Sequence, residues 1–425
     1  MRLYNTQTRR LDGLPPPPGP IRMYFCGPTV YQRIHVGNAR PFVLSMWLAR
    51  WLRYRGYEVV LAENITDIND KIYEAAPGAS AELAASATRW YLEDTDRLGL
   101  GRPDREPRAT DTIPQIVAAI DRLIAQGDAY EVQGDVYFRV ARDPEYGRLS
   151  GQRPDQVEEQ EPSALKEDSR DFALWKATKE WEDTRWDSPW GLGRPGWHIE
   201  CSVMAEQHLG PVFEIHGGGL DLVFPHHENE RAQSRALGHE FARLWMHNGM
   251  VRFVGEKMSK SLGNVVFLRD ALDRWGPEPI LLFLLGAHWR KPVDLSDETL
   301  AQARAQAQSF RDAFLDWNGT APEIAPELAD ALDEDFNTPA ALALMHGWKD
   351  EGRLELVAPA LDLFGLTSLT VAPVAPAEIV ELAERRRRAR AAGGYDDADR
   401  LRDEIAAHGW EVRDVADGFR LVPKP

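Results

Sequence analysis

Residues 21–62 carry a pattern that few folds accommodate: an apolar strand, an amphipathic helix and a second apolar strand in direct succession. Residues 21–26 form a short strand-like run. A helix is expected from about residue 38 to residue 55, because apolar side chains recur on one helical face and Gly56 follows as a stop. Residues 57–62 then have the pattern of a second strand. Two strands joined through a helix pair in parallel, which predicts an α/β fold with its ligand site at the strand ends.

The middle of the chain indicates that this sheet domain is split by an insertion. From about residue 107 to residue 195 the pattern loosens into helical and irregular stretches. The sheet pattern is expected to resume at residues 197–201. A helix over residues 225–237 and a strand near residues 244–251 follow.

The last third of the chain has a mainly helical pattern. Ser296 is a suitable cap for a long helix, whose apolar face is expected to comprise Leu300, Ala307, Phe310, Phe314 and Trp317. Ala-rich helices continue to about residue 369, and two prolines within residues 370–377 are typical of a linker. A small helical and strand-like segment completes the chain.

Composition restricts the function classes. The formal net charge is −17, which does not favour general attraction to nucleic acid, and the one dense basic cluster is residues 385–388 with Arg390. No apolar run is long enough to span a bilayer; residues 280–285 are the densest and indicate a buried helix. The first ten residues lack the apolar stretch of a secretory signal. We therefore expect a cytoplasmic protein that does not engage a membrane.

Four residues have side chains suited to a metal. The chain contains two cysteines, Cys26 and Cys201. A cytosolic chain rarely keeps a structural disulfide, so each is either a small buried hydrophobe or a metal ligand. His226 and Glu230 are four residues apart, directly after a proline suited to opening a helix, and so share one helical face. With the cysteines they form a Cys₂-His-Glu set suited to tetrahedral zinc.

Two alternatives to this set stay open. The same spacing is found on a solvated, charge-rich helix face. Within a metal site, the neighbouring His227 and Glu228 would compete as ligands.

Two segments have the residue types of a phosphate site. His35, Gly37 and Asn38 lie between the first strand and the first helix, where anions bind and a glycine leaves room for a flat base. Lys257-Met-Ser-Lys-Ser261 places Lys257 and Lys260 in a loop suited to clamp transferring phosphates. The alternatives are an ordinary strand-to-helix turn and a solvated basic loop. The chain has no G-x-x-x-x-G-K-[ST] motif, so P-loop chemistry is not predicted.

Together, these two segments resemble the signature pair of class I aminoacyl-tRNA synthetases. Longer segments resemble the cysteinyl-tRNA synthetases specifically, and the likeness runs over nearly the whole chain. These segments begin at Cys26, Asn64, Gly196, His216, Asp335 and Ala398. The chain departs from the family pattern at Asn69, where the family has the first residue of an Asp-Asp pair, and its C-terminal region is shorter. Asn38, in place of the last histidine of the first signature, is a variant associated with many family members.

The resemblance implies a particular set of site residues. It implies one zinc ion per chain, bound to the sulfur of the substrate cysteine and held by Cys26, Cys201, His226 and Glu230. Thr66 and Trp197 match pocket residues of the family. The positions that match its ATP site, where Mg²⁺ accompanies the nucleotide, are His35, Gly37, Asn38, Asp221 and Lys260.

The resemblance also implies a division of the chain around a split Rossmann-like catalytic domain. Residues 1–106 and 196–264 would form its two halves, the second with the zinc site and the lysine loop, and residues 107–195 would be a connective insertion. The rest would comprise a stem-contact region at 265–310, a helical tRNA-binding bundle at 311–370 and a small anticodon-binding domain at 371–425.

The activity implied is ATP-dependent ligation of L-cysteine to tRNA(Cys) by a monomer, through cysteinyl-adenylate and with release of pyrophosphate. A zinc-bound thiolate would separate cysteine from serine, which an apolar pocket discriminates only about 10²-fold. One alternative is a ligase that delivers activated cysteine to a small amine, as in the mycothiol pathway. Another is a non-catalytic module that binds nucleic acid or zinc.

Overall fold

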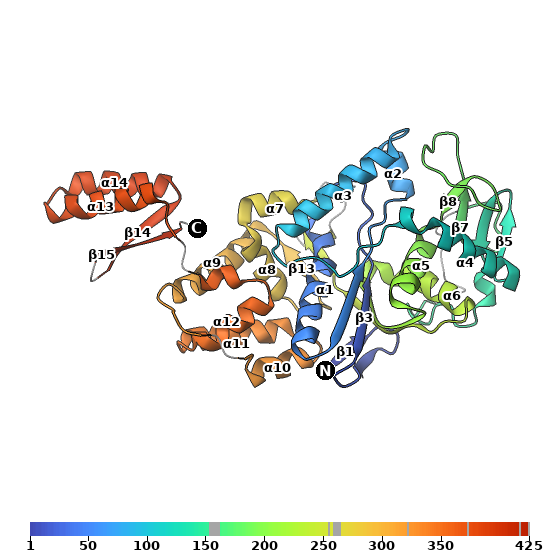
Figure 1. The fold of residues 1–425 in the computed structure, drawn as a ribbon, viewed down its shortest axis with the longest axis horizontal. Coiled ribbons are helices and arrows are strands. Elements are labelled where there is room, and N and C mark those ends of the chain that lie inside the picture. Colours follow the sequence, from blue (N-terminus) through green and yellow to red (C-terminus); the bar gives the residue numbers. More distant parts are fainter. Residues whose placement is uncertain are drawn as a thin grey trace.

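The computed structural model describes residues 1–152, 162–253, 256–257, 265–320, 323–371, 374–415 and 418–423. At its centre is a parallel sheet with the strand order β10-β9-β3-β4. Its strands are β3 (Pro20–Phe25), β4 (Glu58–Glu63), β9 (Val212–Gly219) and β10 (Phe241–Asn248). Two strands precede the insertion and two follow it, which confirms the predicted split parallel sheet (Figure 1).

The two faces of this sheet are covered by different helices. Along β3, Met23 and Phe25 belong to the hydrophobic core that includes α1 (Val36–Tyr54), whereas Tyr24 belongs to the core that includes α5 (Trp197–Leu209). This alternation follows from the two-residue period of a strand. Helix α1 is followed by the predicted stop, Gly56, whose φ of +84° suits glycine.

The expected strand at residues 197–201 is wrong, because these residues form the first turns of α5. Trp197, Ile199 and Cys201 alternate with polar residues, which imitates the period of a strand. In the structure α5 packs against both the sheet and the insertion, so even Glu200 is buried. A helix buried on several sides has no polar stripe from which its period can be recognised.

The insertion contains more strand than the sequence pattern indicated. After α4 (Ile113–Gln126) it forms an antiparallel sheet in the order β5-β6-β7-β8. The strands are β5 (Ala129–Val132), β6 (Asp135–Phe138), β7 (Phe172–Ala177) and β8 (Gly193–Pro195). Strands this short carry too few alternations to be recognised by period alone.

Helices dominate the region after the central sheet. A small sheet of β11 (Val251–Phe253), β12 (Glu256–Lys257) and β13 (Val293–Leu295) accompanies them. The helices are α7 (Leu268–Trp275), α8 (Pro277–Leu285), α9 (Asp297–Ala313), α10 (Pro326–Asp333), α11 (Thr338–Asp350) and α12 (Leu354–Leu363). The prediction for α9 is confirmed at its start, where the Ser296 hydroxyl accepts a hydrogen bond from the Thr299 N–H. In the part of the chain that the structure describes, every helix is too short or too polar to cross a bilayer.

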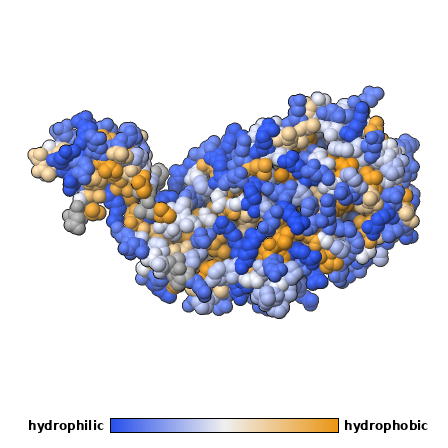
Figure 2. All heavy atoms as spheres, viewed as in Figure 1, coloured by the Kyte–Doolittle hydropathy of each residue, from blue (hydrophilic) through white to orange (hydrophobic). Residues whose placement is uncertain are grey.

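The C-terminal segment forms a unit with its own core at one end of the elongated molecule (Figure 1). It comprises α13 (Ala377–Ala391), α14 (Tyr395–Ala407), β14 (Trp410–Val415) and β15 (Gly418–Pro423). Figure 2 shows this unit projecting from the rest, with hydrophilic residues over its two helices. Ion pairs of Arg413 with Asp312 (3.2 Å) and of Arg420 with Asp316 connect it to α9 and the turn that follows.

The basic cluster of this unit is partly neutralised within the fold. Arg386 is buried and forms an ion pair with Asp414 (2.8 Å), which Arg390 also contacts. Arg385 and Arg388 are exposed on α13. The arginines that face solvent are therefore fewer than the sequence run suggests.

Candidate active site

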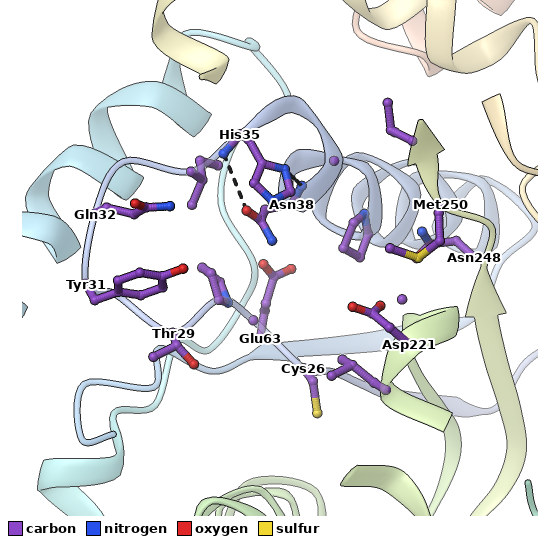
Figure 3. Close-up of a pocket in the computed structure, with 18 of the residues that line it drawn as sticks. Cys26, Thr29, Tyr31, Gln32, His35, Asn38, Glu63, Asp221, Asn248 and Met250 are labelled. Carbon is purple, nitrogen blue, oxygen red and sulfur yellow. Dashed lines mark hydrogen bonds between the residues drawn. The ribbon is translucent and has the colours of Figure 1, made fainter. Parts of the chain in front are cut away.

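A cavity of about 260 Å³ opens where the carboxyl ends of the central strands meet the start of α1 (Figure 3). Six residues named from the sequence line it: Cys26, His35, Gly37, Asn38, Trp197 and Asp221. Thr66 is buried and is not among the described lining residues; its Oγ1 accepts a hydrogen bond from Asn64 Nδ2 (2.9 Å). The cavity occupies the edge of the sheet at which the strand–helix–strand pattern predicted a ligand site.

At one end of this cavity, four donor side chains converge. The ligand atoms of Cys26, Cys201, His226 and Glu230 lie within 4.8 Å of one another, and all four residues are buried. His226 Nε2 lies 3.6 Å from Cys26 Sγ and 3.0 Å from Glu230 Oε1. Cys26 Sγ lies 3.5 Å from the same carboxylate oxygen. Tetrahedral zinc with bonds of about 2.0–2.3 Å places its ligand atoms about 3.3–3.8 Å apart. The two separations from Cys26 Sγ lie in this range, and the His226–Glu230 separation is shorter by a few tenths of an ångström.

The fold brings these donors together from three segments. Cys26 directly follows β3 and Cys201 lies in α5. His226 lies in a single π-type turn (Val223–His227), and Glu230 lies in α6 (Glu228–Ala236), which continues from it. The four-residue spacing therefore places both side chains on one helical face, as the sequence analysis expected.

A second donor set overlaps the first. Cys26, His216, His227 and Glu230 also have ligand atoms within 4.8 Å of one another. His216 Nε2 lies 2.8 Å from Glu230 Oε2, and His227 Nδ1 lies 2.7 Å from His247 Nε2. His227 therefore remains a competing ligand, as expected from the sequence. His216 is a further candidate that its sequence pattern did not indicate.

Glu228, the other competing residue, is used elsewhere. Its Oε2 accepts hydrogen bonds from the Ser150 N–H (2.7 Å) and from the Ser150 hydroxyl (2.8 Å), which ties α6 to the insertion. Glu228 therefore belongs to the packing around the cavity and not to either donor set.

The chemistry of the Cys₂-His-Glu set fits a divalent cation. Burial raises the pKa of the Cys26 and Cys201 thiols and of the Glu230 carboxyl, and it lowers the pKa of His226. The charged forms of these groups are therefore unfavourable without a partner. A cation with two positive charges would offset the two thiolates and the carboxylate that it binds.

Trp197 covers this donor set on the cavity side. Its ring stacks on the imidazole of His226, with centroids 4.1 Å apart and planes 27° apart. The other nitrogen of His226, Nδ1, lies 2.9 Å from His198 Nδ1. These contacts fix the orientation of the imidazole, which a metal ligand requires.

The first signature segment begins α1 and caps it. His35 is the N-cap residue, and its Nδ1 accepts a hydrogen bond from the Asn38 N–H (3.2 Å), while Asn38 Oδ1 accepts one from the His35 N–H (3.4 Å). Because Nδ1 is the acceptor, the neutral ring carries its proton on Nε2. A Cβ on Gly37 would lie 2.9 Å from the His35 ring, so only glycine fits here.

The second signature segment falls mostly outside the described residues. Lys260 lies beyond them, and of Lys257 only the backbone, at the end of β12, is described. The lysine loop therefore stays a prediction.

Sequence reasoning missed several residues that form the cavity. Asn248, at the end of β10, lines it, and its buried Oδ1 has no hydrogen-bond partner among the described residues. Glu63, at the end of β4, also lines it. Arg40 is buried behind the wall formed by Gly249 and Met250 and donates hydrogen bonds to both carbonyl oxygens. The ends of the strands were the available signal for Asn248 and Glu63, because ligands bind there in open parallel sheets.

The architecture is that of class I aminoacyl-tRNA synthetases. Methionyl-tRNA synthetase of Mycobacterium tuberculosis, bound by methionyl-adenylate, matches with a TM-score of 0.58 at 15% identity, over 86% of this chain and 94% of that one. Arginyl-tRNA synthetase of Thermus thermophilus matches with a TM-score of 0.52 at 14% identity, over 86% and 84%. The family model for the class I (C) catalytic domain of tRNA synthetases matches residues 15–305.

Sequence comparisons identify the family within this class. The cysteine–tRNA ligase of Jannaschia sp. (strain CCS1) is 43% identical over 100% of this chain and 97% of its own length. That of Caldicellulosiruptor saccharolyticus is 41% identical over 99% of both. A model for the anticodon-binding domain of cysteinyl-tRNA ligase matches residues 372–419. The chain belongs to the cysteinyl-tRNA synthetase family.

Proposed function

We propose that this chain activates L-cysteine with ATP and transfers it to tRNA(Cys). The observation that carries the proposal is the coverage of the likeness: relatives named cysteine–tRNA ligase match from end to end, and the catalytic and anticodon-binding models both match. The cavity contributes residues for both small substrates. We expect that the protein acts as a monomer in the cytoplasm.

We assign one zinc ion to Cys26, Cys201, His226 and Glu230. Of the two described donor sets, this one contains both cysteines, whereas the other has a second imidazole in place of the second thiolate. Soft thiolate ligands favour zinc. When bound, zinc would take the cysteine thiolate as a further ligand, in preference to the hydroxyl of serine. Trp197 then closes the thiol end of the cavity, and the Thr66 N–H donates a hydrogen bond to the carbonyl oxygen of the lining residue Pro28 (3.2 Å).

In the first step, a carboxylate oxygen of cysteine attacks the α-phosphorus of ATP, and the bond to pyrophosphate breaks. His35 can donate from Nε2 to a phosphate oxygen, and the start of α1 adds the positive end of its dipole. Gly37 leaves room for the nucleotide, Asp221 lines the same cavity, and Mg²⁺ accompanies the nucleotide. We propose that Lys257 and Lys260 stabilise the negative charge that develops on the leaving pyrophosphate.

In the second step, a terminal ribose hydroxyl of tRNA attacks the carbonyl carbon of the adenylate, and AMP leaves.

We propose that residues 1–106 and 196–264 form the catalytic halves around the connective insertion at 107–195. The stem of the tRNA would contact residues 265–310, the helical bundle at 311–370 would bind further along it, and residues 371–425 would bind the anticodon. The last assignment is supported by the anticodon-domain match.

Two assays test this function. ATP–pyrophosphate exchange should depend on L-cysteine and not on L-serine, and the protein should then acylate tRNA(Cys). Acylation of a small amine but not of tRNA would favour the alternative ligase activity. Absence of cysteine-dependent exchange would contradict both.

A further inference from the structure

Glu63 is a buried carboxyl group in the wall of the cavity. It is the last residue of β4 and pairs in register with Phe25, the residue before Cys26. Figure 3 shows its carboxylate between Asn38 and Cys26. Gly27, whose Cβ would collide with the Asn64 carbonyl oxygen (1.8 Å), lies beside Glu63, and both residues line the cavity.

Among the described residues, the hydrogen-bond partners of this carboxyl group are neutral. Glu63 Oε1 accepts from the Tyr91 hydroxyl, on α3 (Ser80–Asp96), at 2.5 Å, and Oε2 lies 3.3 Å from the Ser45 hydroxyl. The neighbouring cation, Arg102, is paired with Glu106. Glu63 is 3% exposed, so water does not compensate its charge either.

The surroundings of Glu63 disfavour its charged form in the free protein. The Ser45 hydroxyl donates its single hydrogen to the carbonyl oxygen of Phe42 (2.8 Å). The contact from the Ser45 hydroxyl to Glu63 Oε2 is the longer of its two (3.3 Å), so Ser45 gives the carboxylate little support. Burial raises the pKa of Glu63 to about 7. A cation entering the cavity would favour the ionised carboxylate, and the proton would pass to solvent.

The proposed substrate brings such a cation. With its thiol at Cys26 and its carboxylate toward the phosphates, cysteine has its ammonium group between these two ends. The other acidic residue in the described lining, Asp221, lies across the cavity beyond β9 (Figure 3). Building on the proposed function, we propose that Glu63 binds the α-ammonium group of cysteine and so selects α-amino thiols over thiols without an amino group.

The test compares two ligands that differ only in this group. L-Cysteine and 3-mercaptopropionate, which lacks the amino group, are measured against wild-type protein, Glu63→Gln and Tyr91→Phe. The KM for cysteine and the inhibition constant for 3-mercaptopropionate both come from pyrophosphate exchange. The Glu63→Gln side chain can keep both hydrogen bonds, because its amide accepts from Tyr91 and donates to Ser45.

We expect Glu63→Gln to raise the KM for cysteine about tenfold or more, because one charge-assisted hydrogen bond to the ammonium group is lost. The inhibition constant for 3-mercaptopropionate and the KM for ATP should stay unchanged. Tyr91→Phe should change the KM for cysteine and the inhibition constant for 3-mercaptopropionate by the same factor. Equal weakening of both thiols by Glu63→Gln would overturn the proposal and leave the function intact. Wild-type protein without cysteine-dependent exchange would overturn the function as well.

Discussion

Arg40, on the second turn of α1, donates a 2.6 Å hydrogen bond from Nη1 to the carbonyl oxygen of Gly249 in the cavity wall. The same side chain reaches the carbonyl oxygens of Met250 (3.4 Å) and His288 (3.2 Å). Burial lowers the pKa of Arg40 to about 10. Its described hydrogen-bond acceptors are carbonyl oxygens and not carboxylates. One buried cation therefore holds the wall of the cavity against the helix that begins at His35.

Replacing Arg40 with Met should weaken the binding of ATP more than that of cysteine. Loss of charged hydrogen bonds worth roughly 1.5–3 kcal/mol predicts an increase of about ten- to a hundredfold in the KM for ATP. Arg50→Met is the matched control, because Arg50 lies on the same helix and also donates to backbone carbonyls, at Asp362 and Leu363, away from the cavity. If Arg40→Met and Arg50→Met change the KM for ATP and the KM for cysteine to the same extent, Arg40 contributes to stability alone.

Removing Cys201 should remove the metal. We expect purified wild-type protein to contain about one zinc ion per chain and Cys201→Ala to contain far less. Elemental analysis measures this directly. Glu228→Gln should keep its zinc, since Glu228 is bonded to Ser150. Loss of zinc in His227→Asn with retention in Cys201→Ala would favour the alternative donor set.

The two roles of His35 can be separated by substitution. Asparagine is a good N-cap residue, so His35→Asn should preserve the start of α1 and the melting temperature. It removes the imidazole Nε2 donor, and we expect the rate of adenylate formation to fall by about 10²-fold. Single-turnover measurements together with thermal melting check both expectations. A parallel fall in stability and rate would mean that capping is the main role of the histidine.

The pKa of Glu63 makes stability depend on pH. The folded-state pKa, about 7, exceeds the ordinary value of 4.5, so the stabilising contribution is complete below pH 4.5 and is lost as the pH rises through 7. Glu63→Gln should therefore stabilise the cysteine-free protein at pH 8, by up to about 3 kcal/mol, and change little at pH 4.5. Melting temperatures across this range would reveal the difference. A pH-independent difference between variant and wild type would contradict the assignment.

Truncation after residue 370 should separate activation from tRNA charging. The C-terminal unit has its own core and contacts the rest through ion pairs such as Arg413–Asp312, so pyrophosphate exchange should persist in its absence. Charging of tRNA(Cys) should fall strongly, and in the full chain it should be more sensitive to salt than exchange is. A parallel loss of both activities and of thermal stability would show that the unit only covers the helical region.

Sequence periodicity predicted α1 and α9 from their recurring apolar residues, and Ser296 was recognised as a cap. It also predicted β3 and β4, although most residues of β3 are buried. It failed for α5 and β9. Helix α5 imitated a strand, and β9 was missed because it ends in three glycines and is enclosed on both faces.

From the residues themselves, the candidate site could be predicted only where its side chains have a characteristic spacing along the sequence. The four-residue spacing of His226 and Glu230 indicates a shared helical face, and the two cysteines are conspicuous because the chain contains no others. Arg40 could not be found this way, because its partner Gly249 is 209 residues away in the chain. Glu63 has the pattern of an ordinary polar strand end until the structure shows that it is buried.

The three-segment origin of the Cys₂-His-Glu set also imposes an order on biosynthesis. Translation produces Cys26 early, then the whole insertion, and only afterwards Cys201, His226 and Glu230. A nascent chain arrested within the insertion therefore presents a single thiol and no metal tetrad. Under the proposed assignment, the four donors can meet only after residue 230 has emerged from the ribosome and β9 has paired with β3.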